Sequence, residues 1–436
     1  MTLNPDQVPS TVGTQLDRTG RRCRATSTVG ASLLLVMVSL SVAMGFLVVP
    51  GTERFGVSTA QFLVYYSIFM LSGAVAVAPM GRLVAKYGPR IVVVLGSALT
   101  ALSYLGMALS PSMIVFYLMS APLGVGWAAS TLLPANTILT GWHTHSRRGL
   151  VLGIAASSTG LGGLVWGLVL PRVFGTMGFS GGLLVFAGLS VLLGVLPGIL
   201  LIHNPPVNAG TANAGGLSRA QARAERRAAL RGFGPAVALL TVTAVLFSIE
   251  SIYGQIQPAV YRSFGIDAVT GGMLLSYFAV CGLLTKPVLG FLHDRLGTKA
   301  LLGALGALFI LGVPAISLLG HLGLWAFLML IPIAAISLGV PTVILPLLTA
   351  KAVGQTRFPA AYGTVVSGMW VGLALGAPLW GLIFDLTGGY GAAMYVAGAV
   401  GLVGLYLAHQ ALRSGDRARA TVDAAGSPVE GERAPA

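Results

Sequence analysis

Two ionisable side chains, Glu250 and Lys286, lie inside long apolar stretches of the sequence. If those stretches cross a bilayer, a charge near its centre costs roughly 2.5–3.5 kcal/mol, and such residues usually serve a function. Lys286 can act there as a fixed cation that meets an anionic substrate. It also lies one turn before Gly290, so its ammonium could instead extend to the polar edge of the membrane. The residues alone leave both interpretations of Lys286 open.

Polar residues recur every seven positions around Glu250, at Thr243 and Gln257, and Tyr253 lies one turn further on. This period predicts a polar stripe on one face of a helix, which must line a cavity or another helix because it cannot face lipid. Tyr253 and Gln257 are therefore candidate substrate-binding residues. Glu250 is a candidate proton carrier, since a carboxyl withdrawn from water can take up a proton. The alternative is that Glu250 is a structural partner of a polar neighbour or lies near the outer interface.

Two loops about 210 residues apart share one pattern of glycines and basic residues. The candidate gating residues are Gly81, Arg82, Lys86, Gly88 and Arg90 in the first loop, and Gly290, Asp294, Arg295, Gly297 and Lys299 in the second. The glycines permit a tight turn. The carboxylate of Asp294 can accept hydrogen bonds from a helix N-terminus or an arginine, and so latch one side closed. The first loop has Ala85 in place of that acid. Its basic residues are thus either latch contacts or simple membrane anchors.

Composition indicates which elements must position these residues. The chain has 436 residues, of which 55% are hydrophobic and only 9% are charged, whereas soluble domains carry about 25% charged residues. Apolar segments of roughly 20 residues, long enough to cross a bilayer, recur along the whole chain. The spans are expected at 29–50, 61–80, 91–109, 113–140, 149–170, 181–202, 234–260, 271–290, 300–319, 322–350, 362–384 and 391–412. The predicted fold class is an all-α membrane protein of twelve transmembrane helices in two six-helix halves.

The charge distribution predicts how these parts are oriented. We expect an N-terminal tail at 1–25, a first half at 26–202, a linker at 203–233, a second half at 234–413 and a C-terminal tail at 414–436. One side holds 22 of the 26 lysines and arginines, in the segments 18–24, 82–90, 147–148, 219–231, 295–299, 351–357 and 413–433. Positive residues mark the cytoplasmic side. The sequence therefore predicts a multi-pass protein of the inner (plasma) membrane with both termini in the cytoplasm, and not a nucleic-acid-binding protein.

The paired loops resemble the signature of the major facilitator superfamily, a G-x-x-x-D-R-x-G-x-(R/K) turn between the second and third helices of each half. Three further segments are similar to the monocarboxylate and oxalate:formate exchanger branch. They are Trp142 with Arg147-Arg148-Gly149, Gly153, Ser158, Gly160, Gly162 and Pro171; Lys286-Pro287-x-x-Gly290; and Gly376-Ala-Pro378-x-x-Gly381 through Asp385 to Tyr390. That branch often has Arg-Pro-x-x-Gly where this chain has Lys286, so the resemblance implies a substrate-facing cation there.

Asp385 stands at the outer end of the eleventh predicted span, before Gly388. Its expected role is in loop structure or in an outer gate. The cations available to it on that side are Arg54, Arg172 and Arg262.

These observations predict a secondary active transporter that moves a small organic anion, most simply a carboxylate, by proton coupling or anion exchange with alternating access. The alternatives are an efflux carrier for multidrug or amphipathic compounds and a non-transporting solute receptor. An enzyme is not expected, because paired carboxylates, a metal cluster and a nucleophile–base arrangement are all missing. No cofactor or metal is expected, and Cys23 and Cys281 form neither a disulfide framework nor a metal site. The expected partners are the lipid bilayer, the anion and protons, and we expect a monomer.

Overall fold

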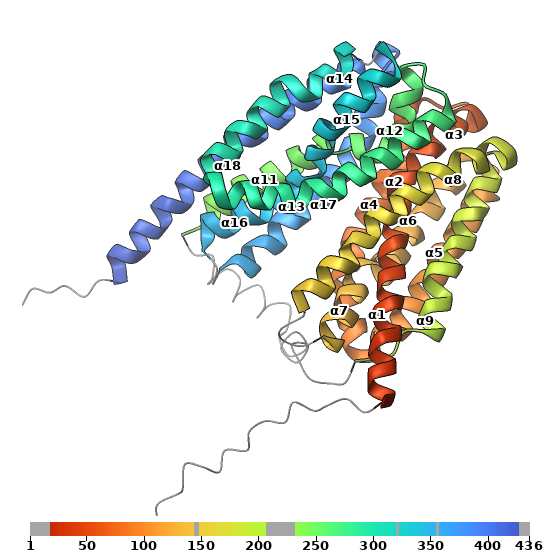
Figure 1. Ribbon diagram of the computed structural model, residues 1–436, viewed down its shortest axis with the longest axis horizontal. Coiled ribbons are helices and arrows are strands. Elements are labelled where there is room, and N and C mark those ends of the chain that lie inside the picture. Colours follow the sequence, from red (N-terminus) through yellow and green to blue (C-terminus); the bar gives the residue numbers. More distant parts are fainter. Residues whose placement is uncertain (1–17, 144–147, 206–231, 320–321, 355–356, 427–436) are drawn as a thin grey trace, which may run out of the picture.

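The computed structural model describes residues 18–143, 148–205, 232–319, 322–354 and 357–426. The structure is a helical bundle (Figure 1) whose first half runs from α1 to α9. The elements of this half are α1 (Arg18–Val38), α2 (Leu40–Ala43), η2 (Met44–Leu47), α3 (Val48–Phe55), α4 (Thr59–Tyr87), α5 (Pro89–Ala108), α6 (Met113–Ser130), α7 (Leu132–Trp142), α8 (Arg148–Ser190), η4 (Val191–Val195) and α9 (Leu196–Leu200).

The second half runs from α11 to α18 and follows the same course. Its elements are α11 (Gly234–Glu250), α12 (Tyr253–Ser263), α13 (Ala268–Ala307), η5 (Leu308–Gly312), α14 (Val313–Leu319), α15 (Leu324–Gly339), η7 (Val340–Ile344), α16 (Leu345–Val353), α17 (Phe358–Thr387) and α18 (Gly391–Gly426). Most of the predicted linker at 203–233, and part of each predicted tail, lie outside the described residues.

The described helices correspond to the twelve predicted spans. Ten are long and apolar enough to cross a membrane, and Leu324–Ile336 is a shorter apolar helix. One of the ten, Ser157–Leu200, covers two predicted spans, because the chain reverses at Gly178, whose φ of 66° and ψ of −169° interrupt the helix. The predicted all-α fold of twelve spans is therefore confirmed.

Glycines in the left-handed region of the backbone divide the two halves in the same way. The pairs Gly56 and Gly265, Gly88 and Gly297, and Gly178 and Gly388 all have positive φ and lie 209 or 210 residues apart. A residue with a Cβ rarely adopts this conformation, so these turns depend on glycine. We call the side of the bundle with the turns at Gly88 and Gly297 the basic end. The side with the turns at Gly56, Gly265, Gly178 and Gly388 is the far end.

The first, fourth, seventh and tenth spans are interrupted midway and occupy equivalent places in the two halves, while the sixth and ninth also pass through wide turns, η4 and η5, that do not correspond. The first span passes through the η2 turn at Met44–Leu47, and the seventh breaks at Ser251 between α11 and α12. The fourth breaks at Thr131 (φ −110°, ψ −118°), and the tenth passes through the wide turn η7. In carriers built from repeats, interrupted spans in corresponding positions indicate where the substrate binds.

The two halves meet most closely toward the far end. Gly167 of α8 crosses Gly272 of α13, where a Cβ on either residue would collide with the carbonyl oxygen of the other. An ideal Cβ on Gly381 of α17 would lie 2.8 Å from the Cα of Ala60 in α4. Small residues permit this close packing in membranes. At the basic end, α7 and α16 lie apart (Figure 1) and make no extensive described contact with the opposite half. The halves are thus joined at the far end and separate toward the basic end.

Helix α18 is longer than the hydropathy pattern predicts. The last span was expected to end at residue 412, but the helix continues to Gly426. The added segment is rich in alanine, a strong helix former. Arg419 Nη2 also pairs with Asp416 Oδ1 at 2.6 Å, three residues earlier on the same helix. Hydropathy marks where a helix leaves the membrane and not where it ends.

Candidate functional site

Lys286 lies on the face of α13 that meets the first half of the bundle. Toward the far end, this face carries Ser276, whose Oγ donates to the carbonyl oxygen of Leu164 at 2.7 Å. Two turns later Leu283 lies 3.5 Å from an ideal Cβ on Gly160. These contacts join α13 to α8. Lys286 is the next residue along the same row, and its side chain is exposed.

The helical period separates Lys286 from the lipid-facing side of α13. At 100° per residue, Lys286 points within about 50° of the mean direction of the row that contacts α8. That row comprises Gly272, Ser276, Ala279 and Leu283. The exposed apolar row of α13 comprises Met273, Val280, Leu284, Val288 and Phe291. Lys286 points about 150° away from that row. The exposed cation therefore faces the boundary between the halves and not the lipid.

The seventh span contains a cluster of buried polar groups without partners. Glu250 is 2% exposed and Gln257 is fully buried. Glu250 Oε2, Gln255 Oε1 and both amide atoms of Gln257 have no hydrogen-bond partner among the described residues, and neither has Ser248 Oγ. An unsatisfied buried polar group costs about 1–3 kcal/mol. These four side chains surround the break between α11 and α12. A polar ligand that reaches this break would gain hydrogen bonds from them.

The four residues singled out in the two neighbouring spans are not all brought together. Lys286 and Glu250, both in the described part of the chain, form no ion pair with each other. Tyr253 is 4% exposed, and its hydroxyl lies 3.3 Å from that of Tyr261. Its ring meets the edge of Phe278 with centroids 5.9 Å apart. Tyr253 thus packs inside the second half.

Thr243, at the start of the predicted stripe, packs against a neighbouring helix. Its hydroxyl donates to Leu239 at 2.9 Å and lies 3.5 Å from the carbonyl oxygen of Gly404 in α18. Of the two surroundings that the seven-residue period allows, a cavity or another helix, Thr243 has the helix. The stripe therefore divides, with packing contacts at Thr243 and Tyr253 and unpaired polar groups at Glu250 and Gln257.

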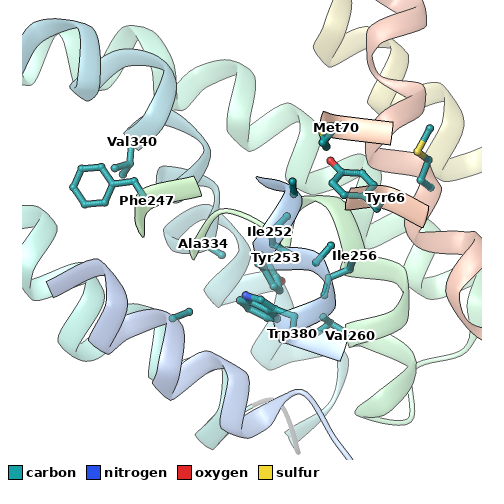
Figure 2. Packing of buried hydrophobic residues seen from close by; sticks show 14 of the residues in the cluster. Tyr66, Met70, Phe247, Ile252, Tyr253, Ile256, Val260, Ala334, Val340 and Trp380 are labelled. Atoms are coloured by element: carbon teal, nitrogen blue, oxygen red, sulfur yellow. The ribbon is translucent and has the colours of Figure 1, made fainter. Parts of the chain in front are cut away.

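Two tryptophans hold the interrupted spans, and the sequence pattern did not single them out for this. Trp380 of α17 is 2% exposed and donates its Nε1 hydrogen to Ile249 O at 3.0 Å, just before the break in the seventh span. Figure 2 shows Trp380 beside Tyr253 among the buried hydrophobic residues. In the other half, Trp166 Nε1 donates to Ser39 Oγ at 2.8 Å, where the first span is interrupted. An indole next to a helix break is a signal that only the folded chain displays.

Asp385 joins the two halves at the far end. Its Oδ1 accepts a hydrogen bond from Thr59 N at 2.9 Å, and its Oδ2 accepts one from Ala60 N at 2.8 Å. These are the first free N–H groups of α4, whose positive end attracts a carboxylate. The sequence left open loop structure or an outer gate contact with an arginine. Arg54 instead donates to Ser180 Oγ at 2.6 Å within its own half, because the unpaired amides of α4 are the donors that Asp385 reaches.

Helix α13, which carries Lys286, is capped at its start by Asp267. The Oδ1 atom accepts from Val269 N at 2.9 Å and from Thr270 N at 3.0 Å. Hydrogen bonds from Thr270 lower the pKa of Asp267 below its ordinary value. Asp267 therefore stays charged at the helix N-terminus, where a negative charge is stabilising.

The gating-loop candidates lie at the basic end. Arg90 holds its turn by donating from Nη2 to Ile199 O at 2.6 Å. Lys86 lies 5.0 Å from the ring centre of Tyr87, and the Arg295 guanidinium lies 4.7 Å from that of Phe291. Both residues are exposed, as is Lys299. The side chains of Arg82 and Asp294 lie outside the described part of the structure, and the latch at Asp294 stays a prediction.

The fold and the repeated interrupted spans define a membrane carrier, and comparison with known proteins agrees. A family model described as Major Facilitator Superfamily matches residues 29–255 and 239–430. Monocarboxylate transporter 13 of Rattus norvegicus is 30% identical over 342 residues, 75% of this chain and 74% of that protein. Its Bos taurus counterpart is 29% identical over 345 residues, again 75% and 74%. The chain belongs to the major facilitator superfamily.

A solved structure shares the fold. It is a bacterial homologue of the human lysosomal transporter Spinster, in an inward-facing and unoccupied conformation. The two superpose with a TM-score of 0.71 at 16% identity, covering 92% of this chain and 99% of that one. Membership of the superfamily makes the protein a multi-pass secondary transporter, and not an enzyme, as predicted.

Proposed function

We propose that this protein carries a small organic anion, most simply a monocarboxylate, across the membrane. The observation that supports this is the exposed, unpaired ammonium of Lys286 on the inter-half face of α13. A cation in a span is costly unless it faces water or a partner. The similarity to proteins named monocarboxylate transporters supports the same substrate class.

In the proposed cycle, the anion enters from the basic end, where the halves are separate, and binds beside Lys286. A carboxylate there replaces water around the ammonium and forms a charge-assisted hydrogen bond. The unpaired groups at Glu250 and Gln257 lie near the break in the seventh span, and Glu250 carries the coupled proton. The far end opens when the contacts of Asp385 and of the crossing at Gly167 and Gly272 separate, which amounts to rocking of one half against the other.

We further propose that the basic end faces the cytoplasm of a cell whose plasma membrane holds the protein, with both termini and the linker inside. This rests on the excess of lysine and arginine at that end. Reporter domains fused after Asn208 and after Ala436 should both give a cytoplasmic signal. A periplasmic signal from either fusion contradicts the orientation.

The substrate class is tested by uptake into proteoliposomes. The purified protein is offered labelled mono- and dicarboxylates, with and without an imposed pH gradient, beside a cationic amphipathic dye. We expect accumulation of a monocarboxylate above that in protein-free liposomes. Dye transport without carboxylate transport would instead support the efflux carrier and overturn the anion proposal.

A further inference from the structure

A cavity of about 650 Å³ lies at the basic end, within the second half alone. It is bounded by the turn of α13 that follows Gly297, by the end of α16 and by the last part of α18. Helix α18 packs on α11, α14 and α16 of its own half, and Figure 1 shows it at the edge of the bundle, away from α1 to α9. The cavity is therefore separate from the inter-half boundary that Lys286 faces.

Four basic side chains line this cavity. They are Lys299, Lys351, His409 and Arg413, and all four are exposed. Lys351 Nζ donates to Thr298 Oγ1 at 2.9 Å, which places its ammonium at the first turn after Gly297. The acid that lines the cavity, Asp416, is paired with Arg419 at 2.6 Å and so does not neutralise these cations. The cavity thus has an unbalanced positive charge suited to a phosphate group.

The same cavity has an apolar side. Leu302, Leu405 and Leu412 line it together with the basic groups. Along α18 toward the membrane, Tyr406 and Val403 lie on the same face as His409 and Arg413, spaced by three or four residues. Tyr406 is 61% exposed and Val403 is 52% exposed. A ligand that follows this face meets cations at one end and an apolar surface at the other.

We propose that this cavity binds the phosphate headgroup of an anionic phospholipid, whose acyl chains lie along the α18 face at Val403 and Tyr406. A small soluble anion would use the cations and leave the leucines and the apolar stripe unused. Basic pockets between spans on the cytoplasmic side suit acidic lipid headgroups. The headgroup would connect α13, α16 and α18, three elements that lie far apart in the sequence.

The test measures lipid binding to the purified full-length protein in detergent by native mass spectrometry. Dioleoyl-phosphatidylglycerol is titrated in parallel with dioleoyl-phosphatidylcholine. The wild type should retain phosphatidylglycerol more tightly. Each basic side chain near an acidic lipid contributes about a factor of five to affinity. The Lys351→Gln, Arg413→Gln double variant should therefore lose affinity for phosphatidylglycerol by about twenty-five-fold.

The matched control is Arg417→Gln, which removes an exposed cation from the same helix outside the cavity lining. It should bind phosphatidylglycerol as the wild type does, and Arg413→Lys should retain most of the affinity. Equal affinity of the wild type for the two lipids overturns the proposal. So does equal loss in the double variant and in Arg417→Gln, which indicates only a general charge effect. Full displacement of phosphatidylglycerol by inorganic phosphate contradicts the lipid assignment and points to a site for free phosphate.

Discussion

Replacement of Lys286 by glutamine probes the proposed anion contact. The substitution removes the charge and leaves a polar side chain of similar reach. Because Lys286 is exposed and has no partner among the described residues, its loss strands no buried group. Protein abundance in the membrane should therefore be unchanged. The effect should appear in the apparent affinity for the anion.

The size of that effect follows from the exposure of Lys286. A hydrogen bond to a charged group contributes about 1.5–3 kcal/mol, which corresponds to about tenfold to 150-fold in affinity. Solvent screens an exposed ammonium, so we expect the lower end, a rise in KM of about tenfold. Lys286→Arg should retain substantial transport, since the positive charge is the essential feature in this proposal.

The assay is the initial rate of uptake against substrate concentration in reconstituted vesicles. Arg172→Gln is the control, because Arg172 is an exposed cation of α8 that donates to Leu168 O of its own helix at 2.7 Å. Wild-type KM in Lys286→Gln would refute the reasoning and leave Lys286 as a membrane anchor. An equal rise in KM in Arg172→Gln would show that overall charge, and not the position of Lys286, governs affinity.

Three further predictions concern coupling and the far end. Glu250→Gln should abolish uphill, proton-driven uptake yet permit exchange of substrate for substrate, and undiminished uphill uptake would remove Glu250 from the coupling step. Asp385→Asn removes the charge that holds the start of α4, which should weaken closure of the far end by about 1 kcal/mol. Distances between spin labels across the far end should then report a several-fold larger open population. An unchanged distance distribution argues against a gate there. Gly272→Val inserts a side chain against the backbone of α8 and should abolish transport, whereas Gly175→Ala, with open space around its Cβ, should transport normally. If Gly272→Val is inserted normally and transports at the wild-type rate, the close crossing is not needed for function.

The spans and the glycine turns could be predicted from the sequence, because hydropathy and glycine spacing determine them. Burial of apolar runs in lipid is a local property, so the twelve spans followed from composition. The turns at Gly88 and Gly297 depend on one backbone conformation that glycine adopts readily, so the repeated loops marked them. The region 149–202 was also divided correctly into two spans, since the chain reverses at Gly178.

The contacts between spans could not be predicted in this way. The direction of Lys286 depends on where α13 touches α8, through Leu283 and Gly160. The partner of Asp385 is a pair of backbone amides, which every helix start offers and no side-chain pattern reveals. Tyr253 has the spacing of a cavity residue but bonds to Tyr261, because the break at Ser251 changes the helical phase after Glu250.

The most direct test of the account is the water accessibility of position 286. The variant Lys286→Cys, with Cys23 and Cys281 replaced by serine, is treated with a membrane-impermeant sulfonated thiol reagent in sealed vesicles of either orientation. The account predicts rapid reaction from the side of the basic end and slower reaction when the transported carboxylate is present. Reaction with a lipid-soluble maleimide alone, at a rate that substrate does not change, would place position 286 in lipid and contradict the central claim.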